Sequence, residues 1–209
     1  MRWRLKIGAN PDADVIYSDQ DQIGAAGQRL NPWFKPGWDP DLLLAHNYIG
    51  DLVVYRRTLL EQIGFLRTSF EGAGFHDLAL RATAATPPDR IGHIPAILYQ
   101  RRDEDREIQS ENALPYLRGI TASHRAVRDH LDSRGDTDAV LKPAPQIPTA
   151  IRVVWPVPEP PPLVSIIVPT RDRADLLAQG VDGVLHRTDY RNLELLIVDN
   201  GSIEPSTHA

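Results

Sequence analysis

The sequence predicts a mixed α/β protein that contains a parallel sheet. Short apolar runs alternate with stretches of helical periodicity along most of the chain, which is the pattern of α/β proteins. Near the C-terminus the order is strand, helix, strand, which is typical of a βαβ unit with parallel strands. Between the two regions, residues 143–162 carry eight prolines in twenty positions. Proline removes backbone donors and disfavours helix, so this segment is predicted to be an extended linker.

The segment before the linker contains short elements of both kinds. The apolar runs predict strands at "DVIYS", "GDLVVYRR" and "IGHIPAILYQ", and helical spacing predicts helices at "DPDLLLAHN", "TLLEQIGFL" and "HDLALRATAA". A longer helix is expected at about 114–134, because apolar residues recur at helical spacing there and Gly135 provides a stop.

After the linker, "LVSIIVPT" and "LELLIVDNGS" are predicted strands, and "RADLLAQGVDGVLHRT" is the helix between them. Parallel sheets bind ligands at the carboxyl ends of their strands. Thr170, Arg171 and Asp199 fall at that edge, so Asp199 is a candidate partner for a nucleobase or ribose and Arg171 for a phosphate. The alternative is that these are ordinary polar residues after buried strands.

Composition narrows the class of protein. The 209 residues are 42% apolar and 24% charged, with a net charge of −5, which indicates a soluble globular protein and gives no reason to expect nucleic-acid binding. The chain has no cysteine, so any metal must bind oxygen or histidine. No apolar run approaches the roughly 20 residues of a membrane span, and "MRWRLKIGAN" is too short in apolar residues for a signal peptide. A cytoplasmic location is therefore expected.

One pair of aspartates follows an apolar run directly. The spacing Asp-x-Asp occurs five times, at 12/14, 19/21, 39/41, 103/105 and 136/138, so the spacing alone is not informative. Only Asp19 and Asp21 close a run of the type Val-Ile-Tyr, whereas Asp39 and Asp41 flank a proline as helix caps do.

Alternation along an extended chain would point both carboxylates of this pair to one side. A hard cation such as Mg²⁺ or Mn²⁺ suits one or two carboxylates together with substrate phosphate oxygens. The pair is therefore a candidate metal site for a phosphate-containing ligand, and a solvated turn after an edge strand is the alternative.

Two long segments resemble one known family. "DADVIYSDQDQIGAAGQRLNPWFKPGWDPDLLLAHNYIGDLVVYRRTLLEQIGFL" is similar to the region around and after the Asp-x-Asp motif of family 2 glycosyltransferases, bacterial enzymes of the rhamnosyltransferase type; the likeness covers about residues 10–102. "PPLVSIIVPTRDRADLLAQGVDGVLHRTDYRNLELLIVDNGS" resembles the nucleotide-binding βαβ that opens the same family's domain, over about 162–205. The family has these segments in the opposite order.

The resemblance therefore implies a fragment of a tandem transferase. Residues 1–102 would be the C-terminal half of a GT-A glycosyltransferase domain, 103–142 a helical segment, 143–162 the linker, and 163–209 the N-terminal βαβ of a second domain. The fold class is thus α/β, with incomplete Rossmann-like pieces and a mixed or parallel sheet. Because each piece lacks its other half, association with another glycosyltransferase chain is expected.

The resemblance also implies an inverting transfer of a sugar from a nucleotide-sugar donor to a saccharide or glycan acceptor, as in polysaccharide biosynthesis. Asp19 would contact the donor, and Asp21 is the more direct ligand of Mn²⁺ or Mg²⁺. Trp33, Trp38, Asp39 and Asn47 fall in the region that shapes the acceptor pocket, where the alternative is that the aromatic residues pack the core.

The chain departs from the family at two positions. The catalytic carboxylate is expected two places before the Asp-Leu of "HDLALR", and Phe75 stands there. Glu71, His76 and Asp77 are the possible substitutes, although a loop charge, a surface histidine and a helix cap are the simpler roles for them. Gln100 stands where relatives often have a histidine able to complete the metal site.

Phe75 keeps other functions open. The chain is predicted to be a partial or degenerate transferase, whose catalytic competence the sequence leaves undecided. The alternatives are a noncatalytic sugar- or nucleotide-binding or assembly remnant, and a phosphohydrolase of the haloacid dehalogenase type with Asp19 as nucleophile. The last lacks the expected Gly and Thr after the second aspartate, where Gln22 and Ile23 stand.

Overall fold

The computed structural model describes residue 8 and residues 11–102 and 113–207. The chain forms two compact units, Met1–Trp155 and Pro156–Ala209. The first part of the predicted helical segment 103–142, together with the pair Asp103 and Asp105, lies outside the described residues.

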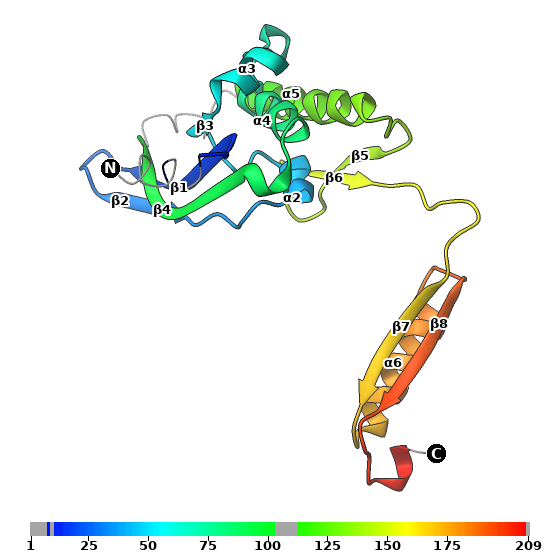
Figure 1. Ribbon diagram of the computed structural model, residues 1–209. Helices are drawn as coiled ribbons and strands as arrows, with labels where there is room; N and C mark the ends of the chain where they lie inside the picture. Colours follow the sequence, from blue (N-terminus) through cyan, green and yellow to red (C-terminus); the bar gives the residue numbers. More distant parts are fainter. Residues whose placement is uncertain (1–7, 9–10, 103–112, 208–209) are drawn as a thin grey trace. The chain divides into compact units, whose positions relative to one another are not determined.

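The N-terminal unit is built around a central strand, β1 (Val15–Ile23) (Figure 1). Strand β4 (Ile91–Arg102) pairs with β1 in parallel over its whole length. On the opposite edge, β3 (Val53–Tyr55) pairs antiparallel with the start of β1 and β2 (Arg29–Trp33) with its end. The sheet is therefore mixed, as the sequence predicts.

The helices of this unit lie close to the predicted positions: α2 (Pro40–Ala45), α3 (Arg57–Ile63), α4 (Gly74–Ala84) and α5 (Ala113–Ser133), with short 3-10 turns η1 (Thr68–Phe70) and η2 (Pro88–Arg90). The predicted cap at Asp39 is confirmed, because its side chain accepts from the backbone N–H of Leu42 at 2.9 Å. Gly135, just beyond α5, has φ +85°, a conformation that favours glycine and ends a helix.

One apolar core joins the sheet to the helices. Val15 and Tyr17 of β1 pack in the same cluster as Leu80 of α4 and Val127 of α5, and all four side chains are almost fully buried. The packing fixes β1 between the helices and its neighbouring strands, so the residues that follow Tyr17 in β1 start from a rigid position.

The proline-rich segment 143–162 differs from the predicted linker in its first half. Strands β5 (Val140–Pro143) and β6 (Ile151–Val154) form an antiparallel pair, and Ile151 is buried in the main core. The reason is that residues 149–155 contain no proline, so this stretch keeps its donors and can pair. The boundary between the units follows at Trp155 and Pro156.

The C-terminal unit is a βαβ unit, as predicted. Strands β7 (Val164–Thr170) and β8 (Leu193–Asp199) are parallel, and α6 (Ala174–Arg187) connects them; a 3-10 turn, η4 (Pro205–Thr207), follows (Figure 1). None of the described residues of this unit is buried, and large apolar side chains of both strands are exposed, including Ile167 and Val198.

Within the parts of the chain that the structure describes, no helix is long and apolar enough to cross a membrane.

Candidate functional site

Asp19 and Asp21 lie inside strand β1 and not after it. The strand continues to Ile23 because β2 and β4 pair with its second half. Both aspartates are almost fully buried, with 3% and 2% of their surface exposed. Pairing irregularities on either side of Asp19 interrupt the simple alternation of side chains expected from the sequence. The carboxylates are therefore built into the sheet and must have partners there.

Asp19 is held by groups of the chain itself. Its Oδ1 accepts a hydrogen bond from the backbone N–H of Lys35 at 3.0 Å and lies 2.8 Å from Nε2 of His93. The His93 ring stacks on Tyr17, with ring centroids 4.9 Å apart. Strands β1 and β4 and the loop after β2 thus fix the orientation of this carboxylate.

Asp21 has one occupied oxygen and one free oxygen. Oδ2 forms an ion pair with Nε of Arg29, the first residue of β2. Oδ1 is buried and has no hydrogen-bond partner among the described residues. Gln100 is the register partner of Asp21 on β4. The two residues that the sequence analysis relates to a metal site, Asp21 and Gln100, are therefore neighbours in the sheet.

The carboxylate of Asp21 has one oxygen that a divalent cation could bind, but the described residues around it supply few other ligands. The described residues contain no group of three or more histidine and acidic side chains that could hold a metal, so the protein offers no complete cage. Arg29 compensates the charge of Asp21 through Oδ2, but the buried Oδ1 has no hydrogen-bond partner among the described residues, which is costly unless a cation or donor binds it. Mg²⁺ and Mn²⁺ are commonly bound by one or two carboxylates plus substrate phosphates.

The N-terminal unit contains a pocket of about 700 Å³. Its lining comes from β1, β2, the loop after α2, the segment around η1, the start of α4, β4 and α5. The lining residues are Gln20, Trp33, Asn47, Gly50, Asp51, Leu66, Arg67, Thr68, Phe70, Glu71, Gly72, Ala73, Gly74, Phe75, His76, Arg101 and Ser123. Its volume is that of a small-molecule site. Gln20, which separates the two aspartates in sequence, reaches this pocket, whereas Asp19 and Asp21 are not part of its lining.

Two residues of the pocket lining have a buried acceptor oxygen without a hydrogen-bond partner. Oε1 of Gln20 and Oδ1 of Asn47 are buried without a hydrogen-bond partner in the described part of the chain, and both residues line the cavity. Asn47 is oriented by its amide, which donates to the carbonyl of Gly50 at 3.3 Å. Each oxygen could accept a hydrogen bond from a hydroxyl donor that reached it.

Of the four residues proposed for the acceptor, Trp33 and Asn47 line the pocket, and Trp38 and Asp39 do not. Trp38 packs against the core, and Asp39 caps α2. The ring of Trp33 stacks near His46 and lies beneath the ammonium group of Lys35, 5.3 Å from its centroid.

The residues considered for the catalytic base differ in their burial and in their contacts. Phe75 is half exposed and lines the pocket, and so does Glu71, whose side chain is exposed. His76, expected at the surface, is 3% exposed, and its Nε2 lies 2.7 Å from the carbonyl of Leu43. Burial lowers the pKa of His76 to about 4. The surface interpretation of His76 is therefore wrong, because α4 turns this ring onto α2.

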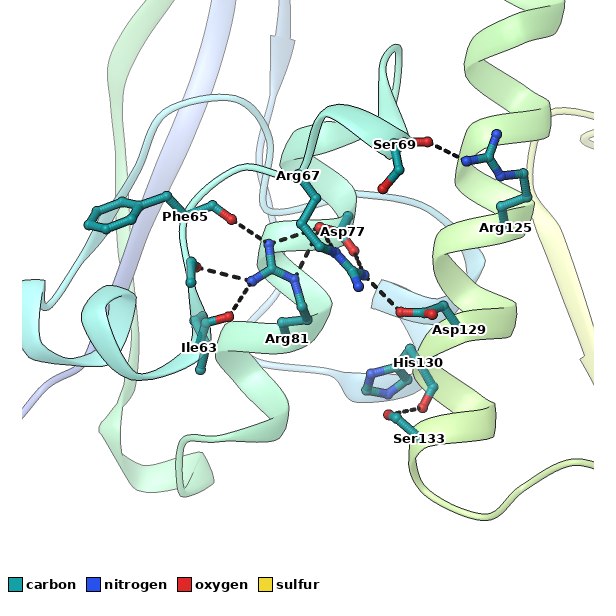
Figure 2. A network of polar contacts seen from close by, with 11 residues as sticks. Ile63, Phe65, Arg67, Ser69, Asp77, Arg81, Arg125, Asp129, His130 and Ser133 are labelled. Atoms are coloured by element: carbon teal, nitrogen blue, oxygen red, sulfur yellow. Dashed lines mark hydrogen bonds and ion pairs between the residues drawn. The ribbon is translucent and has the colours of Figure 1, made fainter.

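Asp77 is enclosed by two arginines (Figure 2). Arg67 contacts its carboxylate with two guanidinium nitrogens, and Arg81 donates to Oδ2 from Nε and from Nη2 at 3.1 and 2.9 Å. Burial alone would raise the pKa of Asp77, but the two guanidinium groups outweigh it and hold the pKa below its usual value. The carboxylate lies in the first turn of α4 and does not act as the predicted cap, because the N-cap is Ala73.

Sequence reasoning did not identify three residues at this site: Gln20, Lys35 and Asp51. Lys35 is 6% exposed, donates to the carbonyl of Ile49 at 2.6 Å, and has its pKa lowered to about 8 by burial. Asp51 is a second carboxylate in the pocket lining. No motif marks any of the three; Gln20 was identifiable only as the residue between two selected aspartates.

In the C-terminal unit the predicted donor residues lie at the carboxyl edge of β7 and β8. Thr170 and Asp199 are register partners, and the backbone N–H of Asn200 donates to the carbonyl of Thr170 at 2.8 Å. Asp199 accepts from the backbone and hydroxyl of Ser202. Asp172, at φ +48°, accepts from two backbone amides of the C-terminal segment. Arg171 follows Thr170 at the same edge.

Comparison with known proteins finds a family match in the C-terminal unit and two longer relatives. Residues 165–209 match the profile of glycosyl transferase family 2. The O-antigen biosynthesis protein RfbC of Myxococcus xanthus is 42% identical over 205 residues, which are 98% of this chain and 16% of that protein. The uncharacterized protein y4gI of Sinorhizobium fredii is 41% identical over 204 residues, 96% of this chain and 22% of that protein.

The chain spans about a fifth of the length of these curated relatives. Both likenesses run through the two units and the segment between them, so the order of the units recurs in the longer proteins. The family model therefore supports the resemblance of the C-terminal segment to family 2 glycosyltransferases, over residues 165–209.

Proposed function

We propose that this chain is part of a family 2 glycosyltransferase that transfers a sugar from a nucleotide-sugar donor to a saccharide acceptor in surface-polysaccharide synthesis. The observation that carries the acceptor half of the proposal is the pocket with two unpartnered buried acceptors, Gln20 and Asn47, beside the ring of Trp33. A sugar offers the matching groups, because it has hydroxyl donors around its edge and an apolar face that stacks on indole. The name of the Myxococcus relative supports the polysaccharide context.

On this proposal the chain's own residues bind and orient the reactants. Gln20 and Asn47 accept hydrogen bonds from acceptor hydroxyls, and Trp33 covers one face of the ring. Glu71 and Asp51 are the carboxylates of the pocket lining, so they are the groups placed to receive the proton of the attacking hydroxyl. Asp77 is not part of that lining and is held by Arg67 and Arg81.

Two separate sets of residues are candidates for donor binding. Asp19 and Asp21 belong to the N-terminal unit, with Asp21 as the candidate ligand of Mn²⁺ or Mg²⁺, and Thr170, Arg171 and Asp199 belong to the C-terminal unit. A divalent cation bound at Asp21 would neutralise the charge of the diphosphate leaving group. Arg171 and the edge of β7 and β8 are the candidate contacts for the nucleotide. A cytoplasmic location, where nucleotide sugars are made available, stays a prediction.

The acceptor site is tested by titrating the full chain with a panel of methyl glycosides and following tryptophan fluorescence, since Trp33 lines the pocket. At least one glycoside should change the signal, and Asn47→Ala should weaken its binding about fivefold through loss of one hydrogen bond. Asn192→Ala, an amide in the C-terminal unit that bonds the carbonyl of Pro161, is the matched control. Equal affinity in Asn47→Ala and the parent chain would contradict the assignment.

One observation favours a second candidate, a noncatalytic saccharide-binding remnant. Phe75 stands where the family resemblance expects the base, and its half-exposed ring lines the pocket. If the missing carboxylate is the defect, Phe75→Asp should give transfer or donor hydrolysis that the parent chain lacks. Phe65→Asp, at an exposed position outside the lining, controls for a carboxylate placed elsewhere. Activity in the parent chain would reject this candidate.

A further inference from the structure

The ion pair between Arg29 and Asp21 joins an exposed group to a buried one. The side chain of Asp21 is 2% exposed, whereas that of Arg29 is 57% exposed. The guanidinium contacts only Oδ2 of the carboxylate, and Oδ1 is left without a partner among the described residues. One positive side chain therefore compensates a buried carboxylate incompletely.

The position of Arg29 explains why it reaches Asp21. Residues Gly24–Gln28 form the turn between β1 and β2, closed by the hydrogen bond from the N–H of Gly24 to the carbonyl of Gln28 at 2.9 Å. Arg29 is the first residue of β2 and the register partner of Ile23 on β1, so it lies on the strand adjacent to Asp21. Asp19 differs, because a backbone amide and His93 hold it.

We propose that Arg29 is a built-in competitor for the divalent cation, and that it sets the affinity of Asp21 for metal. This inference rests on the proposed function, which makes Asp21 the metal ligand. A guanidinium and a metal ion require the same negative charge, so Arg29 must release the carboxylate, at least in part, before a cation can bind. Because the side chain of Arg29 is 57% exposed, water can solvate its guanidinium group when it leaves the carboxylate.

Metal affinity alone tests the inference. Mn²⁺ binding to the full chain is measured by electron paramagnetic resonance of the free ion, at constant ionic strength because salt screens the exposed partner. Arg29→Ala should bind Mn²⁺ about fivefold more tightly than the parent chain, the gain expected from removing one competing ion pair. Arg29→Lys keeps the charge but loses the planar fork, so its affinity should fall between the two.

Two further variants make the result specific. Arg57→Ala removes an arginine that is 88% exposed and paired with Glu61 on α3, and it should leave Mn²⁺ affinity unchanged. Asp21→Asn should abolish the binding. Circular dichroism of each variant shows whether the sheet is intact, and a variant that does not fold is replaced by Arg29→Gln, which preserves bulk and polarity.

The outcomes separate the inference from the proposed function. If Arg29→Ala binds Mn²⁺ as the parent chain does, or more weakly, while Asp21→Asn loses binding, Arg29 is a structural partner and the inference is overturned with the metal site intact. If neither the parent chain nor Arg29→Ala binds Mn²⁺, the metal assignment of Asp21 fails as well. Tighter binding in Arg29→Ala that Asp21→Asn abolishes supports both.

Discussion

Asp77 is the residue whose environment says most about its role. Its carboxylate is 1% exposed and is shared by Arg67 and Arg81, and Arg67 also reaches Asp129 on α5 (Figure 2). Arg81 in addition donates to the carbonyls of Ile63 and Phe65. Through Arg67 and Arg81, the carboxylate of Asp77 therefore links α4 to α5 and to the segment that follows α3.

Replacing Asp77 by Asn should destabilise the N-terminal unit by about 3 kcal/mol at pH 7, because two arginines lose their buried counter-ion. Asp129→Asn, at a half-exposed partner of Arg67, should cost less than about 1 kcal/mol. Urea denaturation measures both. Since the folded pKa of Asp77 is below its usual value of 3.8, its contribution is complete above that pH and is lost as the pH falls further. The gap between the parent chain and Asp77→Asn should therefore shrink in acid.

His76 gives the N-terminal unit a second dependence on pH. In the unfolded chain its pKa is near 6.5, whereas burial lowers the folded value to about 4, so between these values the unfolded state binds more protons. The contribution of the neutral, buried His76 to the free energy of unfolding is fully present above pH 6.5. The free energy of unfolding should fall by about 3 kcal/mol as the pH approaches 4. His76→Gln should flatten this part of the profile, measured by urea denaturation at several pH values. His186→Gln, at an exposed ring, should leave it unchanged.

At the scale of single residues, the sequence predicted the positions of strands and helix caps better than the burial and the partners of individual side chains. The run "VIY" correctly marks a buried strand, and the cap at Asp39 follows from the proline after it. The burial of His76 depends on α2, which is distant in sequence, and the pairing of Asp77 depends on Arg67, which lies outside helix α4. The pocket residue Asp51 has no local signal at all. Tertiary contacts of this kind are not contained in local pattern.

At the scale of elements, the turn before β3 is built closely around Gly50. Its φ is +86°, and an added Cβ would lie 2.5 Å from both Oε1 of Gln20 and Nζ of Lys35. Gly27, in the turn between β1 and β2, has a similar φ of +79° but no atom within 4 Å of the added Cβ. A substitution at Gly27 therefore tests backbone strain alone, whereas the same substitution at Gly50 adds the effect of close packing.

Gly27→Ala should cost about 1 kcal/mol, the strain of a left-handed residue with a side chain. Gly50→Ala should cost about 2 kcal/mol or more, because it adds displacement of Gln20 and Lys35. It should also weaken glycoside binding, since Gln20 and Gly50 line the pocket. Thermal denaturation and the fluorescence titration measure the two effects. An equal loss of stability for both substitutions would show that the side chains of Gln20 and Lys35 move aside from the added methyl group at little cost.

The elements that the sequence missed have a common cause. Strand β2 contains Pro32 and, at Asn31, a positive φ of +47°, so its run "RLNPW" lacks the alternation of a strand. Strand β6 lies in a segment whose composition predicts a linker, yet its partner β5 and the buried Ile151 hold it. Each missed strand forms through its partner, whereas the strands β1, β4, β7 and β8 were predicted from their own apolar runs.

At the scale of the whole molecule, the two units differ in how much they bury. The N-terminal unit has a continuous core, whereas the described residues of the C-terminal unit include none that is buried. A two-stranded sheet with one helix is too small to exclude water on its own. The family match lies in this C-terminal unit, over residues 165–209.

A fragment of residues 1–155 should therefore unfold with the same midpoint as the full chain, and residues 156–209 alone should show no cooperative transition. Differential scanning calorimetry of the two fragments and of the full chain measures this. The C-terminal fragment should also bind a hydrophobic dye strongly, because Ile167, Val198 and other apolar side chains are exposed. A sharp transition in that fragment would show that the βαβ unit is stable by itself.

The proline run that separates the units also has a kinetic meaning. Pro156 and Pro162 are the ends of a seven-residue stretch with five prolines, which at about 3.1 Å per residue extends roughly 20 Å. A tether of this length raises the effective concentration of one unit around the other to the millimolar range. Encounters between the two units are therefore intramolecular, and their rate does not depend on the concentration of the protein.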